Sequence, residues 1–556
     1  MLGLGSHQPA TSLTTPWPTH DPPMTEPDQG ILIASLGKVL QAGLGAVPAR
    51  LLQTHISYVL LTGQYAYKIK KAVNLGFLDF STLELRRFYC EEELRLNRRY
   101  APDLYLDVVA IGGTAQAPVL GGPGPAIEYA VRMREFDQET LASRLLARGE
   151  LMPADIDALA GRLAQFHAAC TPTGSEGGPA PARSILQPAR DNFSAILQLP
   201  GEALDRAEVE RLRAWTESEF TRLLPLFRQR QAGGFVRECH GDLHLGNIAR
   251  IAGELTFFDC IEFSADLRWI DVINETAFLV MDLHAHGRPD YGHRLLNAYL
   301  EHTGDYAGLA LLRFYVIYRA MVRAKIAVLR ARQEGEAQGR NALEEASRYV
   351  ALATAWTQPA RPALILTHGL SGSGKSTVTQ GLLQAIGAIR VRSDVERKRQ
   401  AGLPAQAGSG SQPGAGLYAG AVTEATYRHL LDLARGIVGA GFPAIIDATF
   451  LQRAQRDAFR DWAGAHGVPC AILSLQAPET VLRERILRRA GTGQDASEAT
   501  LAVLDRQLAS QQELGADELA ATVSCDAARP ITEARSAALG AALRERLARA
   551  MPCPAN

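Results

Sequence analysis

Two segments of the chain group residue types that could perform chemistry. The first covers residues 240–247, with the one-letter sequence HGDLHLGN, and is followed by Asp259. The second covers residues 369–376, with the sequence GLSGSGKS. Carboxylate and amide oxygens suit magnesium, and the backbone amides of glycine-rich turns suit phosphate. Each segment is therefore a candidate for holding a magnesium-bound polyphosphate, by different means.

The second segment has the Gly-x4-Gly-Lys-Ser spacing of a phosphate-binding P-loop. It lies between an apolar strand pattern at 363–367 and an apolar-periodic helix pattern at 378–386, which is the context the motif requires. We expect backbone amides at the helix N-terminus to face the phosphates, Lys375 to reach the β- and γ-phosphates, and Ser376 to bind magnesium. The predicted nucleotide-binding residues are Gly369, Leu370, Ser371, Gly372, Ser373, Gly374, Lys375, Ser376 and Thr377.

Asp242 and Asn247 in the first segment, together with Asp259 after it, could supply oxygen atoms for chemistry or metal binding. Residues 248–251 and 255–258 read as two short strands joined by a turn, so Asn247 and Asp259 should meet at the open end of a hairpin. Two oxygen ligands on one side of a cleft favour magnesium. Asp242, on the loop before the hairpin, could accept a proton from a substrate hydroxyl.

This loop resembles the catalytic loop of aminoglycoside phosphotransferase-like kinases, a branch of the protein-kinase-like fold. The resemblance implies that Asp242 is the catalytic base and that Asn247 and Asp259 bind magnesium. It also implies a strand lysine paired with a helix glutamate. Lys68 best matches the family pattern, and Lys70, on the same strand face, is its rival.

The glutamate partner is predicted from a helical face. Residues 89, 90, 93, 94, 96, 97 and 100 form one mostly apolar stripe, and Glu93 falls in its middle. A carboxylate in that position needs a partner, whereas Glu91 lies outside the stripe. From the family resemblance, Asp271 is expected to brace the catalytic loop rather than to perform chemistry.

The C-terminal half resembles the gluconate-kinase-like and polynucleotide-kinase-like group of P-loop kinases. Asp394 then contacts or deprotonates the acceptor hydroxyl, and Arg397 helps to hold the substrate; a solvated charged helix start is the alternative. Asp447 ends an apolar strand and is expected near the metal. Arg485 and Arg489 lie one turn apart on a predicted lid helix and could neutralise the transferring phosphate, although a plain amphipathic helix fits as well.

The predicted strands and helices that position these residues indicate an α/β multidomain protein. We expect a disordered lead-in at 1–28 and a bilobal protein-kinase-like (α+β) domain at 30–355, with its small lobe at about 30–136 and its large lobe at 137–355. A linker at 356–362 leads to a P-loop α/β domain with a parallel sheet at 363–530 and a C-terminal helical tail at 531–556. Low-complexity stretches at 171–182 and 401–416 read as surface loops.

Composition and charge limit the partners and the cellular compartment that we expect for this chain. The 556 residues carry a net charge of −1, and residues 361–530 hold 18 Lys and Arg against 16 Asp and Glu, so a phosphate-tracking groove for nucleic acid is not favoured. Seven scattered cysteines without a CxxC pair indicate a reducing cytoplasm. No membrane association is expected, because no apolar run reaches spanning length.

As a whole the chain resembles bacterial fusions of an aminoglycoside phosphotransferase-like domain with an ATP-binding kinase domain. The function predicted is a bifunctional kinase that uses ATP and Mg²⁺ to phosphorylate hydroxyl groups of small molecules. Two alternatives stay open. One is a nucleotide-sensing regulatory protein with a single catalytic domain, and the other is a C-terminal nucleic-acid 5′-kinase. The acceptors and the oligomeric state do not follow from the sequence.

Overall fold

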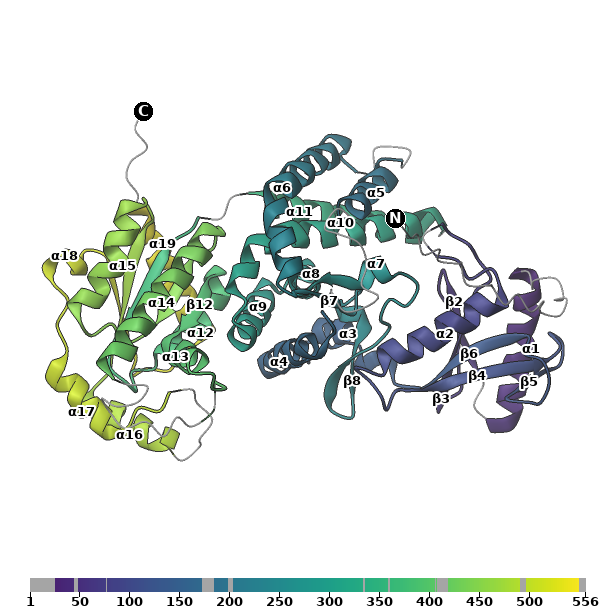
Figure 1. The fold of residues 1–556 in the computed structure, drawn as a ribbon, viewed down its shortest axis with the longest axis horizontal. Coiled ribbons are helices and arrows are strands. Elements are labelled where there is room, and N and C mark those ends of the chain that lie inside the picture. The colour runs from purple at the N-terminus through teal and green to yellow at the C-terminus, as the bar shows by residue number, and fades with distance from the viewer. Residues whose placement is uncertain are drawn as a thin grey trace, which may run out of the picture. The chain divides into compact units, whose positions relative to one another are not determined.

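The computed structural model describes residues 26–549 except 45–48, 77, 173–184, 199–203, 334–335, 359–360, 406, 408–418 and 491–496 (Figure 1). Most of the predicted lead-in, much of both low-complexity stretches and two residues of the predicted linker lie outside the described residues. Helix α1 (Glu26–Leu44) begins two residues before the expected end of the lead-in. The described chain separates into two compact units, 1–136 with 262–264, and 137–261 with 265–556.

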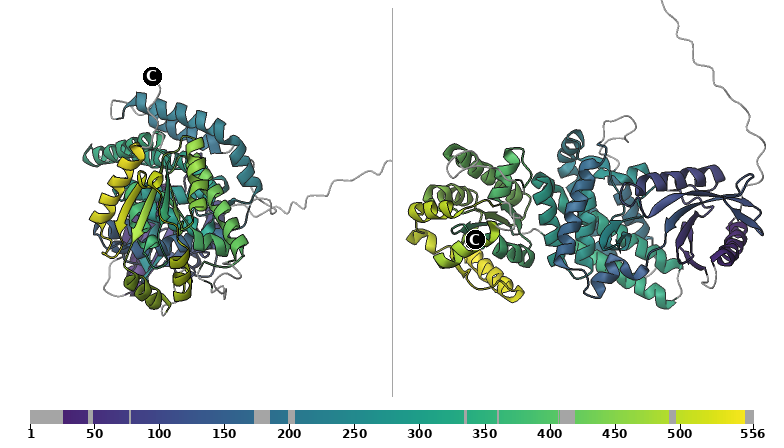
Figure 2. Two further views of the ribbon diagram at one scale, coloured as in Figure 1. Left: turned by 90° about the vertical axis from the view of Figure 1, so that its left-hand side faces the viewer. Right: turned by 90° about the horizontal axis from the view of Figure 1, so that it is seen from below.

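The first unit is a six-stranded antiparallel sheet with a helix on each face (Figure 2). Its strand order is β1-β2-β3-β6-β4-β5. The bounds are β1 Arg50–Gln53, β2 Ser57–Leu61, β3 Tyr65–Lys70, β4 Tyr105–Gly113, β5 Pro118–Leu120, β6 Glu128–Arg134 and α2 Leu83–Asn97. Thr82 caps α2 by accepting a hydrogen bond from the Leu85 amide, which fixes where the helix starts.

Alternation along β3 sends its side chains to opposite faces of the sheet. Tyr67 and Ile69 pack with the apolar side of α1, while Lys68 and Lys70 point to the face that α2 covers. The β2–β3 hairpin carries both lysines, and α2 carries Glu93.

The second unit begins with a mainly helical region. Its longer helices are α3 Ala142–Ala147, α4 Pro153–Ala169, α5 Leu186–Leu197, α6 Arg206–Ala232, α8 Val272–Ala285, α9 Pro289–Thr303, α10 Leu309–Gln333 and α11 Glu336–Thr357. Short elements are η1 Gln138–Thr140, η3 Leu245–Asn247, α7 Ala265–Arg268 and η4 Tyr306–Gly308. Two small antiparallel pairs, β7 Val236–Glu238 with β10 Trp269–Asp271 and β8 Ile248–Ile251 with β9 Glu254–Phe257, flank residues 239–247. Helix α8 is buried along almost its whole length and forms the core beneath that segment.

The same unit ends in a five-stranded parallel sheet of order β12-β13-β11-β14-β15. Its strands are β11 Leu364–His368, β12 Ile389–Arg392, β13 Ala444–Asp447, β14 Cys470–Gln476 and β15 Thr522–Asp526. Its helices are α12 Lys375–Ile386, α13 Ser393–Gln400, α14 Gly420–Gly439, α15 Arg453–Ala465, α16 Glu479–Ala490, α17 Leu501–Ser510, α18 Ala516–Leu519 and α19 Glu533–Arg549. The bilobal kinase-like and parallel P-loop fold classes are thereby confirmed.

Helix α19 corrects the predicted end of the P-loop domain. Leu539 and Leu543 of α19 belong to the same buried cluster as Leu382 and Leu383 of α12 and Ile365 of β11. The segment expected as a tail from residue 531 is therefore, as far as Arg549, a core helix. Its Ala- and Arg-rich sequence has only a narrow apolar stripe, so the sequence alone predicts a peripheral helix.

Candidate functional sites

In the first unit, both strand lysines meet one buried glutamate. Lys68 Nζ lies 2.7 Å from Glu93 Oε1, and Lys70 Nζ lies 2.8 Å from Glu93 Oε2. Lys70 also forms an ion pair with Glu262 and sits over the ring of Phe80, 4.9 Å from its centroid. Burial by itself would raise the pKa of Glu93, but the two ammonium groups outweigh it and lower that pKa to about 2.

The two lysines differ in surroundings. The Lys70 side chain is completely buried between two carboxylates, whereas the Lys68 side chain is 11% exposed. Glu262 was missed by sequence reasoning, because its partner lies 192 residues away. The only available signal was a charged residue placed three positions after Asp259 in an otherwise apolar stretch.

In the second unit, the catalytic-loop residues come together at the open end of the β8–β9 hairpin. Asn247 Nδ2 donates to the backbone oxygen of Asp242 at 3.0 Å and to its carboxylate at 3.2 Å. The Phe258 amide donates to the Asn247 carbonyl at 3.1 Å, which places Asp259 next to that end of the hairpin. Asp259 adopts a left-handed backbone with φ of +64°, a conformation rare outside glycine and common at functional sites.

The Asp242 carboxylate is held in its ionised form. Burial would raise its pKa, but the nearby His244, Arg323 and His240 together bring that pKa below its usual range. His244 lies 3.7 Å from the carboxylate, and its other ring nitrogen accepts from the Gly246 amide at 3.0 Å. His240 Nε2 lies 2.8 Å from the Phe258 carbonyl oxygen, so both histidines of the loop have local partners.

A chain of buried side chains braces the loop from behind. Glu275, on α8, accepts from the Gly241 amide at 2.8 Å. Its second oxygen lies 2.9 Å from one ring nitrogen of His167, whose other nitrogen lies 2.9 Å from the Tyr299 hydroxyl. His167, Glu275 and Cys239 bring ligand-type atoms within 4.8 Å of one another. Because both His167 nitrogens already have polar neighbours, we assign the cluster to bracing rather than to metal binding.

This bracing corrects the expectation for Asp271. Its carboxylate forms a two-pronged ion pair with Arg230 and caps α8 through the Ile273 amide, rather than contacting the catalytic loop. Glu275 and Asp282 do so instead, the latter by accepting from the Leu245 amide at 2.8 Å. The usable signal was two carboxylates within the almost wholly buried helix α8, where each needs a partner.

The glycine-rich loop at 369–374 lies between β11 and the N-terminus of α12. Gly374 directly precedes α12 and adopts a left-handed backbone with φ of +82°. A Cβ on Gly372 would approach the Leu482 carbonyl to 2.8 Å, and one on Gly369 the Leu475 carbonyl to 2.7 Å. Only glycine fits both places, because a side chain there would clash with these backbone oxygens.

The polar groups of this loop fit a magnesium-bound triphosphate. Lys375 Nζ donates to the carbonyls of Gly369 and Leu370 at 3.0 and 2.9 Å, and so lies folded over the loop. Ser376 Oγ donates to Asp447 Oδ2 at 2.8 Å, bringing two hard oxygen donors together. The buried Ser373 hydroxyl has no hydrogen-bond partner within the described chain.

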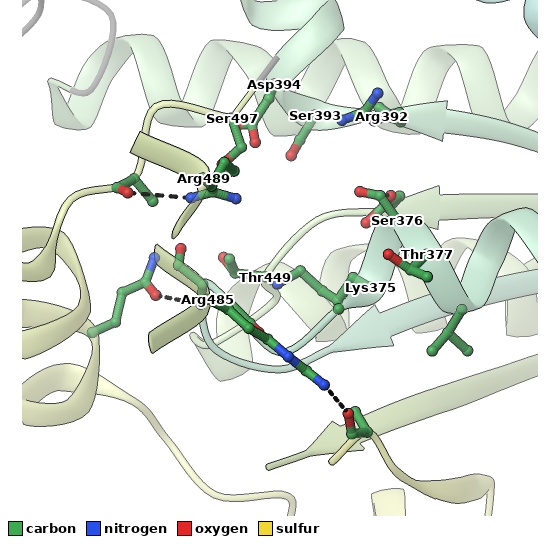
Figure 3. Close-up of a pocket in the computed structure, with 18 of the residues that line it drawn as sticks. Lys375, Ser376, Thr377, Arg392, Ser393, Asp394, Thr449, Arg485, Arg489 and Ser497 are labelled. Carbon is green, nitrogen blue, oxygen red and sulfur yellow. Dashed lines mark hydrogen bonds between the residues drawn. The ribbon is translucent and has the colours of Figure 1, made fainter. Parts of the chain in front are cut away.

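A cavity of about 570 Å³ joins the loop to the predicted acceptor and lid residues (Figure 3). Arg397 Nη1 lies 3.7 Å from Asp394 Oδ1, and both line the cavity. Arg485 donates to the Ala527 carbonyl at 2.8 Å, and Arg489 to the Ala499 carbonyl at 3.2 Å. Every P-loop-domain site residue predicted from the sequence except Gly369, Leu370 and Ser373 lines this one cavity; those that sequence reasoning missed include Arg392, Tyr427, Thr449 and Arg529.

Two family models match separate parts of the chain. A family model described as "Phosphotransferase enzyme family" matches residues 90–312, and one described as "AAA domain" matches residues 364–514. No described helix is both long and apolar enough to cross a membrane.

Related sequences and structures cover both halves. Uncharacterized proteins of Mycobacterium tuberculosis and Mycobacterium bovis are 32% identical over 458 residues, 81% of this chain and 88% of theirs. A gluconokinase from Sinorhizobium meliloti 1021 is 24% identical over 34% of this chain and 94% of its own, with a TM-score of 0.24. An ADP-bound aminoglycoside phosphotransferase is 15% identical over 57% of this chain and 98% of its own, with a TM-score of 0.33.

The assignment rests on the two family models and on the mycobacterial relatives, which span both domains. The chain therefore belongs to the family of ATP-dependent kinases in which an aminoglycoside phosphotransferase-like domain is fused to a C-terminal P-loop kinase domain.

Proposed function

We propose that both domains are active phosphotransferases, each transferring the γ-phosphoryl group of ATP to a hydroxyl of a small molecule. The observation that carries this proposal is the presence in each half of a base candidate close to residues that could hold magnesium. In the kinase-like half, Asn247 donates to the carboxylate of Asp242, and Asp259 follows the same end of the β8–β9 hairpin. The Ser376–Asp447 pair shares a cavity with Asp394 in the P-loop half.

In the kinase-like domain, Asp242 would receive the proton of the acceptor hydroxyl. The hydroxyl oxygen forms a bond to the γ-phosphorus, the bond from that phosphorus to the β-phosphate oxygen breaks, and ADP leaves. A carboxylate of lowered pKa stays ionised at neutral pH and can take this proton once the forming bond has made the hydroxyl acidic. Asn247 and Asp259 would hold magnesium, which supplies neutralisation of the phosphate charge.

Lys68, rather than Lys70, is our choice for the phosphate lysine. Lys70 is enclosed by Glu93 and Glu262, so moving it toward a phosphate would leave two buried carboxylates short of a cation. Lys68 keeps partial exposure while Glu93 orients its ammonium group. In this assignment Lys70 is the structural member of the pair.

In the P-loop domain, the roles divide between the loop and the cavity wall. The loop amides and Lys375 would hold the phosphates, and Ser376 with Asp447 would hold magnesium. Asp394 would accept the proton of the acceptor, Arg397 would hold the acceptor, and Arg485 and Arg489 would neutralise the transferring group; their position around one cavity supports these roles. Burial lowers the pKa of Lys375, with Asp447 and Asp394 opposing that effect.

The test is transfer of labelled phosphate from ATP by the full chain, screened over sugars, aminoglycosides, nucleosides and 5′-hydroxyl oligonucleotides. Wild type, Asp242→Ala, Lys375→Ala and the double variant are compared, with the exposed Asp266→Ala as a control. We expect each single variant to lose one set of labelled products and to keep the other. If both single variants label the same products as the wild type, these sites do not carry the reaction.

Two other results would redirect the proposal. Loss of all labelled products in one single variant, with none lost in the other, would identify a single catalytic domain beside a nucleotide-binding regulatory one. Labelling of oligonucleotides that weakens steeply with salt and depends on Lys375 would identify a nucleic-acid 5′-kinase.

A further inference from the structure

Helix α9 joins the kinase-like region to the edge of the P-loop sheet. Both segments belong to one compact unit. The Asn297 side chain donates to the Ala388 carbonyl at 3.0 Å and accepts from the Arg390 amide at 2.7 Å. These are the two bonds that a neighbouring strand would make, so Asn297 satisfies the edge of β12.

One turn further on, Glu301 reaches two arginines of the P-loop domain. Its carboxylate lies 3.2 Å from Arg390 Nη2 and 2.9 Å from Arg392 Nη1, and its side chain is 23% exposed. Burial would raise the pKa of Glu301, but Arg392 and Arg390 outweigh it and keep that pKa below its usual value. The carboxylate is therefore charged at neutral pH and separates two like charges.

Both arginines lead directly to the P-loop site. Arg390 Nη1 donates to the backbone oxygen of Ser376 at 2.9 Å and lies 3.4 Å from Thr379 Oγ1, behind the residue that would bind magnesium. Arg392 lines the 570 Å³ cavity beside Asp394 (Figure 3). Arg399, in the following helix, donates to the Glu301 carbonyl at 2.6 Å, which ties the end of α9 to α13.

Helix α9 is itself firmly held in the kinase-like region. Tyr299, two residues before Glu301, contacts His167 in the chain that braces the catalytic loop. Arg294 forms an ion pair with Asp157 of α4. A positioning residue acts well only when its own backbone is fixed, and Glu301 meets that requirement.

We infer that Glu301 is a positioning residue for the P-loop site, supplied by the kinase-like domain. It holds Arg390 behind Ser376 and directs Arg392 toward the acceptor side of the cavity. The P-loop site is thus complete only with α9 in place. This inference rests on the proposed nucleotide site at Lys375, although the contact itself does not.

The test measures Mg-ADP binding to the full chain by titration calorimetry, following the site that Lys375→Ala abolishes. We expect E301Q to weaken that site about tenfold, as loss of a charge-assisted interaction does, and E301D to recover most of the loss. Asp290→Asn is the matched control, because Asp290 lies on the same helix and is paired with Arg288, away from β12. Melting temperatures should stay within about 2 °C.

The possible outcomes test the role of Glu301 and the nucleotide site at Lys375 separately. Unchanged ADP affinity in a folded E301Q variant overturns the inference, and if E301Q does not fold, unchanged affinity in a folded E301A variant does so. A binding profile that Lys375→Ala leaves intact overturns the nucleotide-site assignment instead. In that event, hydrogen exchange over residues 388–400 still tests the contact of Glu301 with the two arginines. Faster exchange in E301Q, but not in Asp290→Asn, supports this contact, and equal exchange in the two variants contradicts it.

Discussion

The two candidate sites differ in how far apart in sequence their parts lie. The P-loop site is built around eight consecutive residues whose glycines and helix N-terminus form the phosphate cradle by themselves. The residues proposed for the kinase-like site come from β3, α2 and the loops around β8–β9, and they are spread over almost 200 positions. A local phosphate cradle forms mainly from its own residues, although Glu301 of α9 supports the surrounding site, whereas a dispersed site depends on buried charges to hold its parts.

The largest effect is expected from the base of the dispersed site. Asp242→Asn removes the proton acceptor while preserving shape, so kcat for the kinase-like product should fall by about 10³-fold. Steady-state kinetics on that product measures the change. A fall of less than about tenfold, with an unchanged melting temperature, would show that Asp242 is not the base.

The next effect separates the two lysines. Lys70→Met leaves Glu93 and Glu262 buried without their shared cation and should reduce the free energy of unfolding of the first unit by about 3 kcal/mol. Lys68→Met should instead lower kcat/KM with a smaller loss of stability. Denaturant unfolding and kinetics compare the pair, with the exposed Lys38→Met as control. Equal behaviour of the two variants would reject the division of roles.

The proposed metal position of the P-loop site can be tested by comparing single and double variants of Ser376 and Asp447. Ser376→Ala and Asp447→Ala should each lower kcat/KM of the P-loop product by about 10²-fold, because each removes an oxygen donor from one proposed metal position. Since the two side chains are hydrogen-bonded at 2.8 Å, the double variant should lose little more than either single one. Fully additive losses would indicate that they act separately.

The smallest effect concerns pH. The pKa of Glu93 is about 2 in the folded chain and near its ordinary value when unfolded, so its contribution is complete above about pH 4.5 and is lost as the pH falls toward 2. Melting curves of the wild type should therefore decline below pH 4.5 more steeply than those of Glu93→Gln, by on the order of 2 kcal/mol in unfolding free energy. Parallel curves would contradict this linkage.

The same contrast explains what could be predicted from sequence. The P-loop and the β8–β9 hairpin follow from neighbouring residues, and Glu93 follows from the apolar face of one helix. Glu262, Glu275 and Glu301 were missed because each is defined by a partner that is distant in sequence. Helix α19 was placed outside the domain because three-dimensional packing, rather than composition, makes it part of the core.

The central claim is that one chain carries two separate nucleotide sites, and the number of bound nucleotides tests it most directly. Equilibrium dialysis of the full chain against labelled Mg-ADP should give two molecules bound per chain. Lys375→Ala and Lys68→Met should each reduce that number to one, and the double variant should bind none. A wild-type stoichiometry of one, or loss of both molecules in either single variant, would contradict the presence of two independent sites.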